Sequence, residues 1–361
     1  MSFHFLRSGS SIIQCQVVLL DNSQFITSFE QKTVKGSELL DRVCDKIQVP
    51  INYKQYFGLQ YIDREDGELV WLNLEKELSP QRKSKPLLYQ FAVKVFPRDP
   101  LKVEENLRWL ILLHVKALIN RGKFSLPVGK HAMIDGFYVQ AMLGDFSSKR
   151  HKPGYLEELL DLLYFPPTGI NTDENISEES YEVMVKDLHK SHRGMTREEA
   201  VSAALDVCKE LDNYGACMHY GISDRNGEEV VFCITMDGMR ICHLKSKFPE
   251  VGELCYSFQW RDIISMFCDN AKFYMYVGEI KEKQESTCHV FRFSKGLFAH
   301  KAAQRLLTDA ENHQKFFFED NPERATLIRS RSLEVQSLNK IRNGSLLSAK
   351  LNLSFRKPIP K

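Results

Sequence analysis

The segment from Cys255 to Arg261 combines residue types that occur together in one catalytic loop. A cysteine followed after five residues by an arginine is the skeleton of a tyrosine-phosphatase loop, which would hydrolyse a phosphate ester. The residues between them include no glycine to let backbone N–H groups converge on a phosphate, and Leu254 stands where a histidine is expected. We therefore interpret the segment as a β-strand followed by Trp260, which anchors a β-sandwich.

Three other motifs also lack what their chemistry requires. Gly129-Lys130 has neither the upstream glycine nor the following Ser or Thr of a phosphate loop. Cys242-His243 and the single His114 have no partners at metal-ligand spacing, so we expect them in the core or on the surface. No nucleophile, base and orienting group can be combined, and the sequence predicts no enzyme activity, no metal and no cofactor. The function should therefore lie in binding.

A central stretch, residues 189–215, organises the elements around it. Thr196 followed by Glu199 forms a capping box, which begins a helix. Apolar residues then recur at helical spacing, while charged residues occupy the other faces. The predicted buried stripe consists of Val201, Ala204, Leu205, Cys208 and Leu211. Gly215 is expected to close the helix, and strand-like residues start after it.

The chain before this stretch has two different patterns. Strands are expected at 15–20, 25–29, 57–62 and 87–96. Ser37 is expected to cap a helix that Pro50 ends, so this part predicts a ubiquitin-like lobe, 14–97, after a mobile lead, 1–13. Apolar helices are then expected at about 107–118, 128–143 and 177–192. With the central helix they predict an all-α lobe, 98–213.

After Gly215, short apolar runs follow one another at intervals of roughly 8–12 residues, with turns between them. The runs are 217–222, 230–235, 239–244, 254–258, 263–268, 273–278 and 287–293. A helix follows, whose predicted buried face holds Ala303, Leu306, Leu307, Ala310, His313 and Phe317. This order predicts a β-sandwich with a C-terminal helix, the arrangement of pleckstrin-homology and phosphotyrosine-binding (PH/PTB-like) domains, over 214–318.

Several short motifs resemble those of a FERM domain. Residues 192–195 (HRGM) and 213–215 (NYG) resemble the passage from its second to its third lobe, 56–61 (YFGLQY) its first lobe, and 144–146 (GDF) its middle lobe. The chain most resembles the ezrin, radixin, moesin and merlin group, without that group's long helical and actin-binding C-terminus. The resemblance implies an α+β, three-lobed fold with ubiquitin-like, acyl-CoA-binding-protein-like and PH/PTB-like lobes.

Charge and cysteine content limit the function classes. The formal charge of +2 over 361 residues gives no global field towards nucleic acid. Residues 319–361 hold nine Lys or Arg against four Asp or Glu, which predicts a basic, disordered tail. Nine scattered cysteines indicate a reducing compartment, and no apolar run has bilayer length. We expect a cytoplasmic protein, and the resemblance implies a peripheral place at the plasma membrane and cell cortex, associated with the cytoskeleton.

The PTB-like lobe suggests a peptide-binding groove. In such lobes an extended peptide adds as a strand between the fifth strand and the C-terminal helix. Because strand residues alternate, either Ile264 and Met266 or Ser265 and Phe267 would meet the peptide. The expected groove residues are Ile264, Met266, Phe267, Phe298, Ala302 and Arg305. The alternative is an ordinary edge strand that the helix itself covers.

The resemblance also implies a phosphoinositide site between the first and third lobes. The basic residues available for it are Lys76, Lys301 and Arg305. The matching positions without a lysine are Asn73, Glu77 and Ala303. In the tail, Ser330 and Ser332 lie beside arginines, which basic-directed kinases favour, and are phosphorylation candidates.

Three functions compete. The leading hypothesis is a non-enzymatic cytoplasmic FERM scaffold or adaptor that links cytoplasmic tails of membrane proteins to the cortical cytoskeleton. The first alternative is a regulatory or targeting module related to a FERM-containing phosphatase or ubiquitin ligase, with the catalytic part absent from this chain. The second alternative is a direct binder of phosphoinositides or other anionic phospholipids. No nucleic-acid partner is expected.

Overall fold

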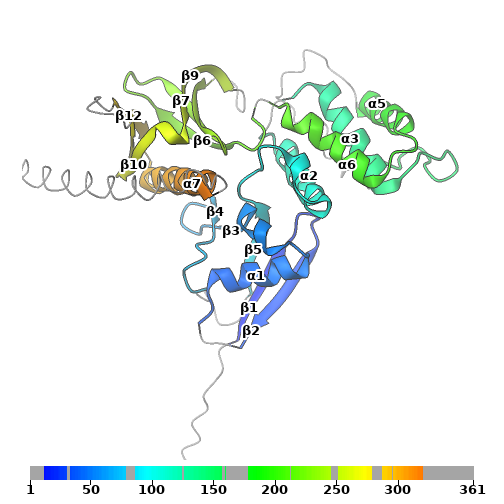
Figure 1. The fold of residues 1–361 in the computed structure, drawn as a ribbon, viewed down its shortest axis with the longest axis horizontal. Coiled ribbons are helices and arrows are strands. Elements are labelled where there is room, and N and C mark those ends of the chain that lie inside the picture. Colours follow the sequence, from blue (N-terminus) through cyan, green and yellow to red (C-terminus); the bar gives the residue numbers. More distant parts are fainter. Residues whose placement is uncertain are drawn as a thin grey trace, which may run out of the picture. The chain divides into compact units, whose positions relative to one another are not determined.

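The computed structural model describes residues 12–30, 33–78, 86–123, 126–156, 159, 178–211, 213–244, 251–278, 287–294 and 296–319. The chain divides into two compact units, whose elements are labelled in Figure 1. The first unit holds Met1–Ala216 and Leu244–Gly252, and the second holds Cys217–His243 and Glu253–Lys361. Among the described residues, no helix combines the length and the apolar character needed to cross a bilayer.

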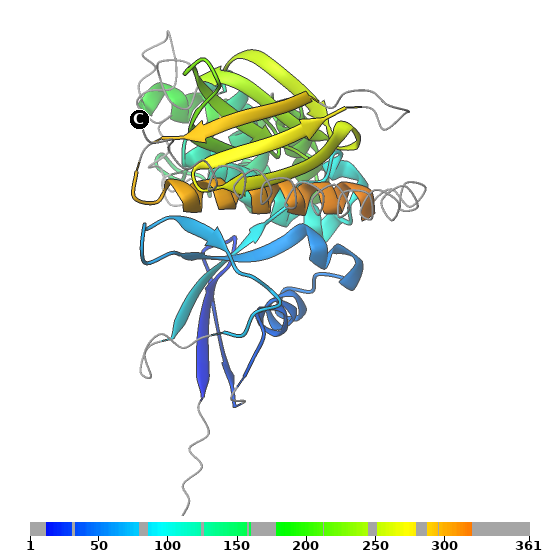
Figure 2. The same ribbon diagram turned by 90° about the vertical axis from the view of Figure 1, so that its left-hand side faces the viewer.

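The first unit begins with a five-stranded sheet and one helix beside it (Figure 2). The elements are β1 (Ile13–Val18), β2 (Gln24–Phe29), α1 (Gly36–Lys46), η1 (Ile51–Tyr56), β3 (Phe57–Ile62), β4 (Leu69–Trp71) and β5 (Leu87–Val93). The strand order is β2-β1-β5-β3-β4, with the central β1 and β5 parallel. Ile13, Cys15 and Val17 alternate inward along β1 because one face of the sheet is buried. This is the predicted ubiquitin-like arrangement.

Helix α1 begins before the residue that was expected to cap it. The helix starts at Gly36, and the backbone N–H of Lys35 donates to Glu38 Oε1 at 2.9 Å. Ser37 therefore lies inside the first turn, and its predicted role as N-cap was wrong because the Glu38 carboxylate already satisfies the helix start. The buried face of α1 includes Leu40, Val43 and Cys44.

The remainder of the first unit is helical. Its elements are η2 (Pro100–Lys102), α2 (Glu105–Asn120), α3 (Val128–Leu143), α5 (Glu178–Ser191) and α6 (Arg197–Lys209). At the start of α6, Thr196 Oγ1 accepts from the Glu199 N–H at 3.2 Å, and Glu199 Oε2 accepts from the Thr196 N–H at 2.8 Å. The capping box is confirmed. The predicted stripe is buried where α6 packs on α2 and α3, and it consists of Val201, Ala204, Leu205, Cys208 and Leu211.

Gly215 does not close α6. The helix ends at Lys209 with Glu210 as its C-cap, and Gly215 lies in the following turn with φ of 66°. A Cβ built on Gly215 would lie 2.7 Å from Phe96 Cβ. The prediction was wrong because this glycine is required by its left-handed backbone and by the close approach of Phe96.

His114 links the sheet of the first unit to its helices. Its Nδ1 accepts from the Val93 N–H at 3.0 Å, and its ring stacks on that of Phe96 with centroids 5.3 Å apart. Burial, with a smaller contribution from Arg121, lowers the pKa of His114 to about 3. His114 is therefore a neutral core residue, one of the two places in which we expected it.

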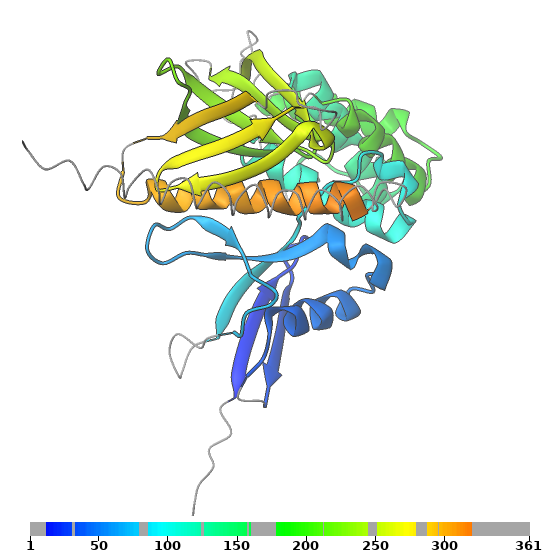
Figure 3. The ribbon, with the colours of Figure 1, turned by 60° about the vertical axis from the view of Figure 1, so that its left-hand side comes forward.

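The second unit is a seven-stranded sheet with one long helix along it (Figure 3). The elements are β6 (Cys217–Ser223), β7 (Glu229–Ile234), β8 (Gly238–Leu244), β9 (Val251–Gln259), η3 (Trp260–Asp262), β10 (Ile263–Asp269), β11 (Lys272–Val277), β12 (Thr287–Phe293) and α7 (Ala299–Glu319). The strand order is β10-β11-β12-β6-β7-β8-β9. Seven strands followed by a helix confirm the PH-like lobe, and with it the α+β, three-lobed fold.

An aromatic core fills this unit. Phe232 meets Phe273 and Phe291 edge-on, with ring centroids 5.6 and 4.8 Å apart. Trp260 is fully buried, and its Nε1 donates to Thr235 O at 3.0 Å, which confirms it as the anchor of the sandwich. The predicted inner face of α7 is buried throughout, and it consists of Ala303, Leu306, Leu307, Ala310, His313 and Phe317.

Candidate peptide-binding edge

Strand β10 lies at one end of the seven-stranded sheet. Within the described part of the chain, its strand partner is β11 alone. The antiparallel register runs from Asp269 opposite Lys272 back to Ser265 opposite Tyr276, and it shifts before Ser265, which places Ile264 in a bulge. An edge strand presents main-chain donors and acceptors to which an added strand can pair.

Helix α7 runs along the length of β10, in the opposite direction. Near one end of the strand, Cys268 Sγ donates to Ala303 O at 3.1 Å. Near the other end, Gln314 Nε2 donates to Ile263 O at 3.3 Å. We name this pairing of Ile263–Asp269 with α7 the β10–α7 edge. Because both ends of the strand bond to the helix, the edge has a fixed geometry.

The side chains of β10 divide between two faces. Met266 and Cys268 pack against the core on which α7 lies. Phe267 points to the opposite face, where its ring stacks on those of Tyr274 and Tyr276 with centroids 4.6 and 6.2 Å apart. Met266 and Phe267 therefore lie on opposite faces of the strand, as the two alternatives required, and which of them meets a peptide stays a prediction.

The other expected groove residues lie along the first turns of α7. Ala302 packs against the same core as Met266. Phe298 directly precedes the helix, and its backbone oxygen accepts a hydrogen bond from the Ala302 N–H at 3.1 Å. Arg305 lies about one turn after Ala302. The side chains of Phe298 and Arg305 are both half-buried. The structure thus brings Met266 and Ala302 to one side of the sheet, flanked along the helix by Phe298 and Arg305.

The β10–α7 edge provides apolar contact rather than reactive groups. Burial raises the pKa of the Cys268 thiol to about 12, with a smaller contribution from Glu311, so the nucleophilic thiolate is not formed near neutral pH. Burial also raises the pKa of Glu311, on the same helix. Apolar side chains beside an edge strand suit an extended peptide held by main-chain hydrogen bonds.

The three candidate lipid-binding residues lie in different units. Lys76 is exposed in the turn after β4, in the first unit. Lys301 and Arg305 are half-buried, one turn apart on α7 in the second unit. A site shared by all three stays a prediction. Ala303, one of the matching positions without a lysine, is fully buried, and the exposed residue of that turn is Gln304.

The motifs that suggested catalysis occupy structural positions. Cys255 lies in β9 and Arg261 in η3, and burial is the main cause that raises the pKa of the Cys255 thiol. Gly129 and Lys130 lie in the first turn of α3, which follows Pro127 and not the glycine-rich turn that a phosphate loop requires. His243 is exposed on β8.

The fold brings together one group of possible ligands that was not predicted from the sequence: Cys217, His219 and Asp309. A Cys-x-His spacing on a strand places both side chains on one face, and that signal was available. Asp309 has no local signal, since it comes from the distant helix α7.

The basic tail lies outside the described residues. The phosphorylation candidates Ser330 and Ser332 belong to it. Their modification and the lipid affinity of the tail remain predictions from sequence.

Comparison with known proteins identifies the family. Residues 17–84 match the FERM N-terminal domain, 98–219 the FERM central domain, and 224–325 the FERM C-terminal PH-like domain. These matches follow one another along most of the chain. The protein belongs to the FERM-domain family.

Band 4.1-like proteins and merlin are among the similar proteins. Human Band 4.1-like protein 2 is 28% identical over 312 residues, which are 86% of this chain and 28% of that protein. Human Band 4.1-like protein 3 is 30% identical over 308 residues, 84% of this chain and 26% of that protein. The chain thus spans less than a third of either relative. The FERM and C-terminal domain complex of Drosophila Merlin matches with a TM-score of 0.70 at 21% identity, over 90% of this chain and 99% of that one.

Proposed function

We propose that this FERM protein is a non-enzymatic adaptor that binds cytoplasmic tails of membrane proteins and links them to the cortical cytoskeleton. The observation that carries the proposal is the edge strand β10, held along α7 with apolar side chains on the shared side. Family membership and the likeness to band 4.1-like proteins support a place between membrane and cytoskeleton. The other two candidate functions have no comparable observation among the described residues.

In this proposal the tail peptide adds to the sheet as a strand beside β10. Main-chain hydrogen bonds supply affinity, and every second peptide side chain turns towards α7, where Met266 and Ala302 favour apolar residues. The bonds from Cys268 and Gln314 hold strand and helix together before the peptide arrives. Because strand and helix are already held together, the protein itself loses little conformational entropy when the peptide binds.

A pair of matched variants tests the site. The full chain is first screened against an array of cytoplasmic-tail peptides, and the tightest binder is measured by calorimetry. Met266→Lys places an ammonium group on the side that faces α7 and should weaken binding by about ten-fold or more. Phe267→Lys makes the same change on the opposite face and should have a much smaller effect.

Thermal unfolding of both variants separates a lost site from a lost fold. A peptide whose alternate backbone nitrogens are methylated gives a test that leaves the protein unchanged, and it should fail to bind because the edge hydrogen bonds are blocked. Equal binding by wild type and Met266→Lys, or full binding by the methylated peptide, would place the peptide elsewhere. Failure of every tail to bind would remove the adaptor proposal itself.

A further inference from the structure

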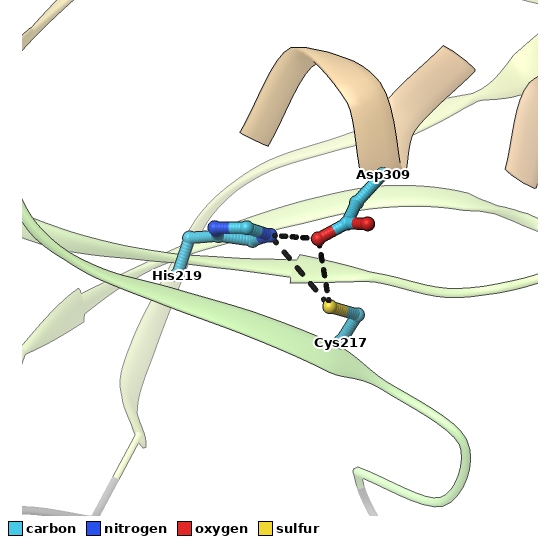
Figure 4. A group of neighbouring side chains, drawn as sticks. All are labelled: Cys217, His219 and Asp309. Carbon is cyan, nitrogen blue, oxygen red and sulfur yellow. Dashed lines mark hydrogen bonds and ion pairs between the residues drawn. The ribbon is translucent and has the colours of Figure 1, made fainter. Parts of the chain in front are cut away.

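A thiol, an imidazole and a carboxylate converge in the second unit (Figure 4). His219 Nε2 lies 3.1 Å from Asp309 Oδ2. Cys217 Sγ lies 3.5 Å from the same oxygen and 3.6 Å from the same nitrogen. Each residue therefore turns one donor atom towards a common centre.

The fold determines this convergence. Cys217 and His219 are two residues apart on β6, so both side chains point to one face of the sheet. Their cross-strand neighbours Ile234 and Phe232 are core residues, which identifies that face as the inner one. Asp309 is buried on α7, which packs against the same core. Three polar side chains at the border of an apolar core require mutual partners or a bound ion.

The geometry does not suit a catalytic triad. In a triad the imidazole meets the nucleophile with one ring nitrogen and the carboxylate with the other, so that a proton can move. Here the single atom Nε2 of His219 faces both Cys217 Sγ and Asp309 Oδ2. Metal ligands have the opposite requirement, since one atom of each must approach the same ion.

The distances match a tetrahedral ion. With zinc bonds of about 2.05 Å to nitrogen, 2.1 Å to oxygen and 2.3 Å to sulfur, tetrahedral angles place the ligand atoms about 3.4 Å (N···O), 3.6 Å (N···S) and 3.6 Å (O···S) apart. The corresponding separations here are 3.1, 3.6 and 3.5 Å. We propose that Cys217, His219 and Asp309 bind a divalent transition metal of the zinc class, with the fourth position for water or a further ligand.

The donor set selects this class of metal. Thiolate and imidazole are poor ligands for Ca²⁺ and Mg²⁺, which prefer oxygen, whereas zinc accepts sulfur, nitrogen and carboxylate oxygen together. The ion would join β6 to α7 and so fasten the helix to the sheet. Binding also requires the Cys217 thiol to lose its proton, so affinity should fall as the pH is lowered.

Cobalt and zinc titrations of the reduced, chelator-treated full chain test the proposal. Co²⁺ should produce the intense visible bands of a tetrahedral site and a thiolate-to-cobalt charge-transfer band in the near ultraviolet, and Zn²⁺ should displace it. Zinc calorimetry in two buffers of different ionisation enthalpy should show about one ion bound and about one proton released. Cys217→Ser, His219→Gln and Asp309→Asn should each weaken binding by about ten-fold or more, and Cys217→Ser should abolish the charge-transfer band.

Matched controls are needed because the chain has nine cysteine thiols, each of which could bind a metal. Cys288→Ser removes another half-buried thiol of the same unit, and His243→Gln removes an exposed imidazole near the Glu228 carboxylate. Neither variant should change metal binding. Asp309→Asn keeps the side-chain shape, and circular dichroism checks that each variant is folded. An octahedral cobalt spectrum without the charge-transfer band, or equal metal binding by wild type and Cys217→Ser, would overturn the site and leave a hydrogen-bonded cluster.

Discussion

At the scale of single residues, His114 should give folding a measurable dependence on pH. Its pKa is about 3 in the folded protein and 6.5 as an ordinary histidine, so below pH 6.5 the unfolded chain binds a proton that the folded chain does not. Stability is then complete above pH 6.5 and falls as the pH drops towards 3. The slope from this one group is about 1.4 kcal/mol per pH unit.

Replacing His114 by glutamine removes that titration while an amide oxygen remains to accept the Val93 N–H. Urea unfolding between pH 6.5 and 4.5 gives the free energy of unfolding at each pH. Its slope against pH should be smaller in the variant than in wild type, by the amount that corresponds to uptake of about one proton. The comparison uses slopes, because the lost stacking on Phe96 lowers the stability of the variant at every pH. Parallel slopes would mean that the His114 ring is protonated in the folded state.

Sequence predicts residue roles well where the partner is local. The Thr196 capping box depends on a residue three positions away and was found. Gly215 and Asp309 depend on partners from distant segments, so the close approach of Phe96 and the convergence with Cys217 and His219 could not be inferred.

At the scale of elements, helix α6 should tolerate no charge on its stripe. Leu205 is fully buried against α2 and α3, so Leu205→Asp would bury a carboxylate without a partner and should cost several kcal/mol, on the order of 3–5. Chemical denaturation measures the change. Asp206→Asn, on the exposed side of the same turn, is the control and should stay within about 0.5 kcal/mol of wild type. A denaturation midpoint for Leu205→Asp equal to that of wild type would contradict the burial of Leu205 between α6 and the helices α2 and α3.

Periodicity predicts strands better than it predicts their register. The strand 263–268 was expected close to its actual bounds, yet the choice between its two faces stayed open. The bulge at Ile264 changes the alternation between Ile263 and Ser265, and hydrophobic alternation alone does not reveal a bulge. In the structure Met266 packs against the core on which α7 lies and Phe267 stacks on the opposite face, while the face that meets a peptide stays a prediction.

At the scale of the whole molecule, the first two predicted lobes form one compact unit. His114 and Gly215 both contact the end of the ubiquitin-like lobe, and a continuous apolar core extends from β1 to α6. Periodicity along the sequence predicted both lobes, but it did not predict that they pack into one unit, because the contacts that join them are long-range. We expect both to unfold in a single transition.

The basic tail gives a prediction about membranes. Residues 319–361 carry nine basic and four acidic side chains, and each basic residue near an anionic surface contributes about 1 kcal/mol. A chain ending at Glu319 should therefore lose most of its binding to anionic vesicles, and the full chain should lose its binding as salt rises. Vesicle sedimentation measures both. Full binding by the shortened chain, with preference for phosphatidylinositol bisphosphate, would instead favour a site that uses Lys76, Lys301 and Arg305.

Amide hydrogen exchange of the full chain, with and without the tightest-binding tail peptide, tests the adaptor site most directly. Added strand pairing should slow exchange along β10 (Ile263–Asp269) and in the first turns of α7, with little change in the first unit. The other end of the sheet, β9, is the natural comparison, since it exposes 57% of Leu254 and 40% of Tyr256. Slowed exchange in β10 and α7 is the result that the account predicts, and protection confined to β9 or to the first unit would contradict it.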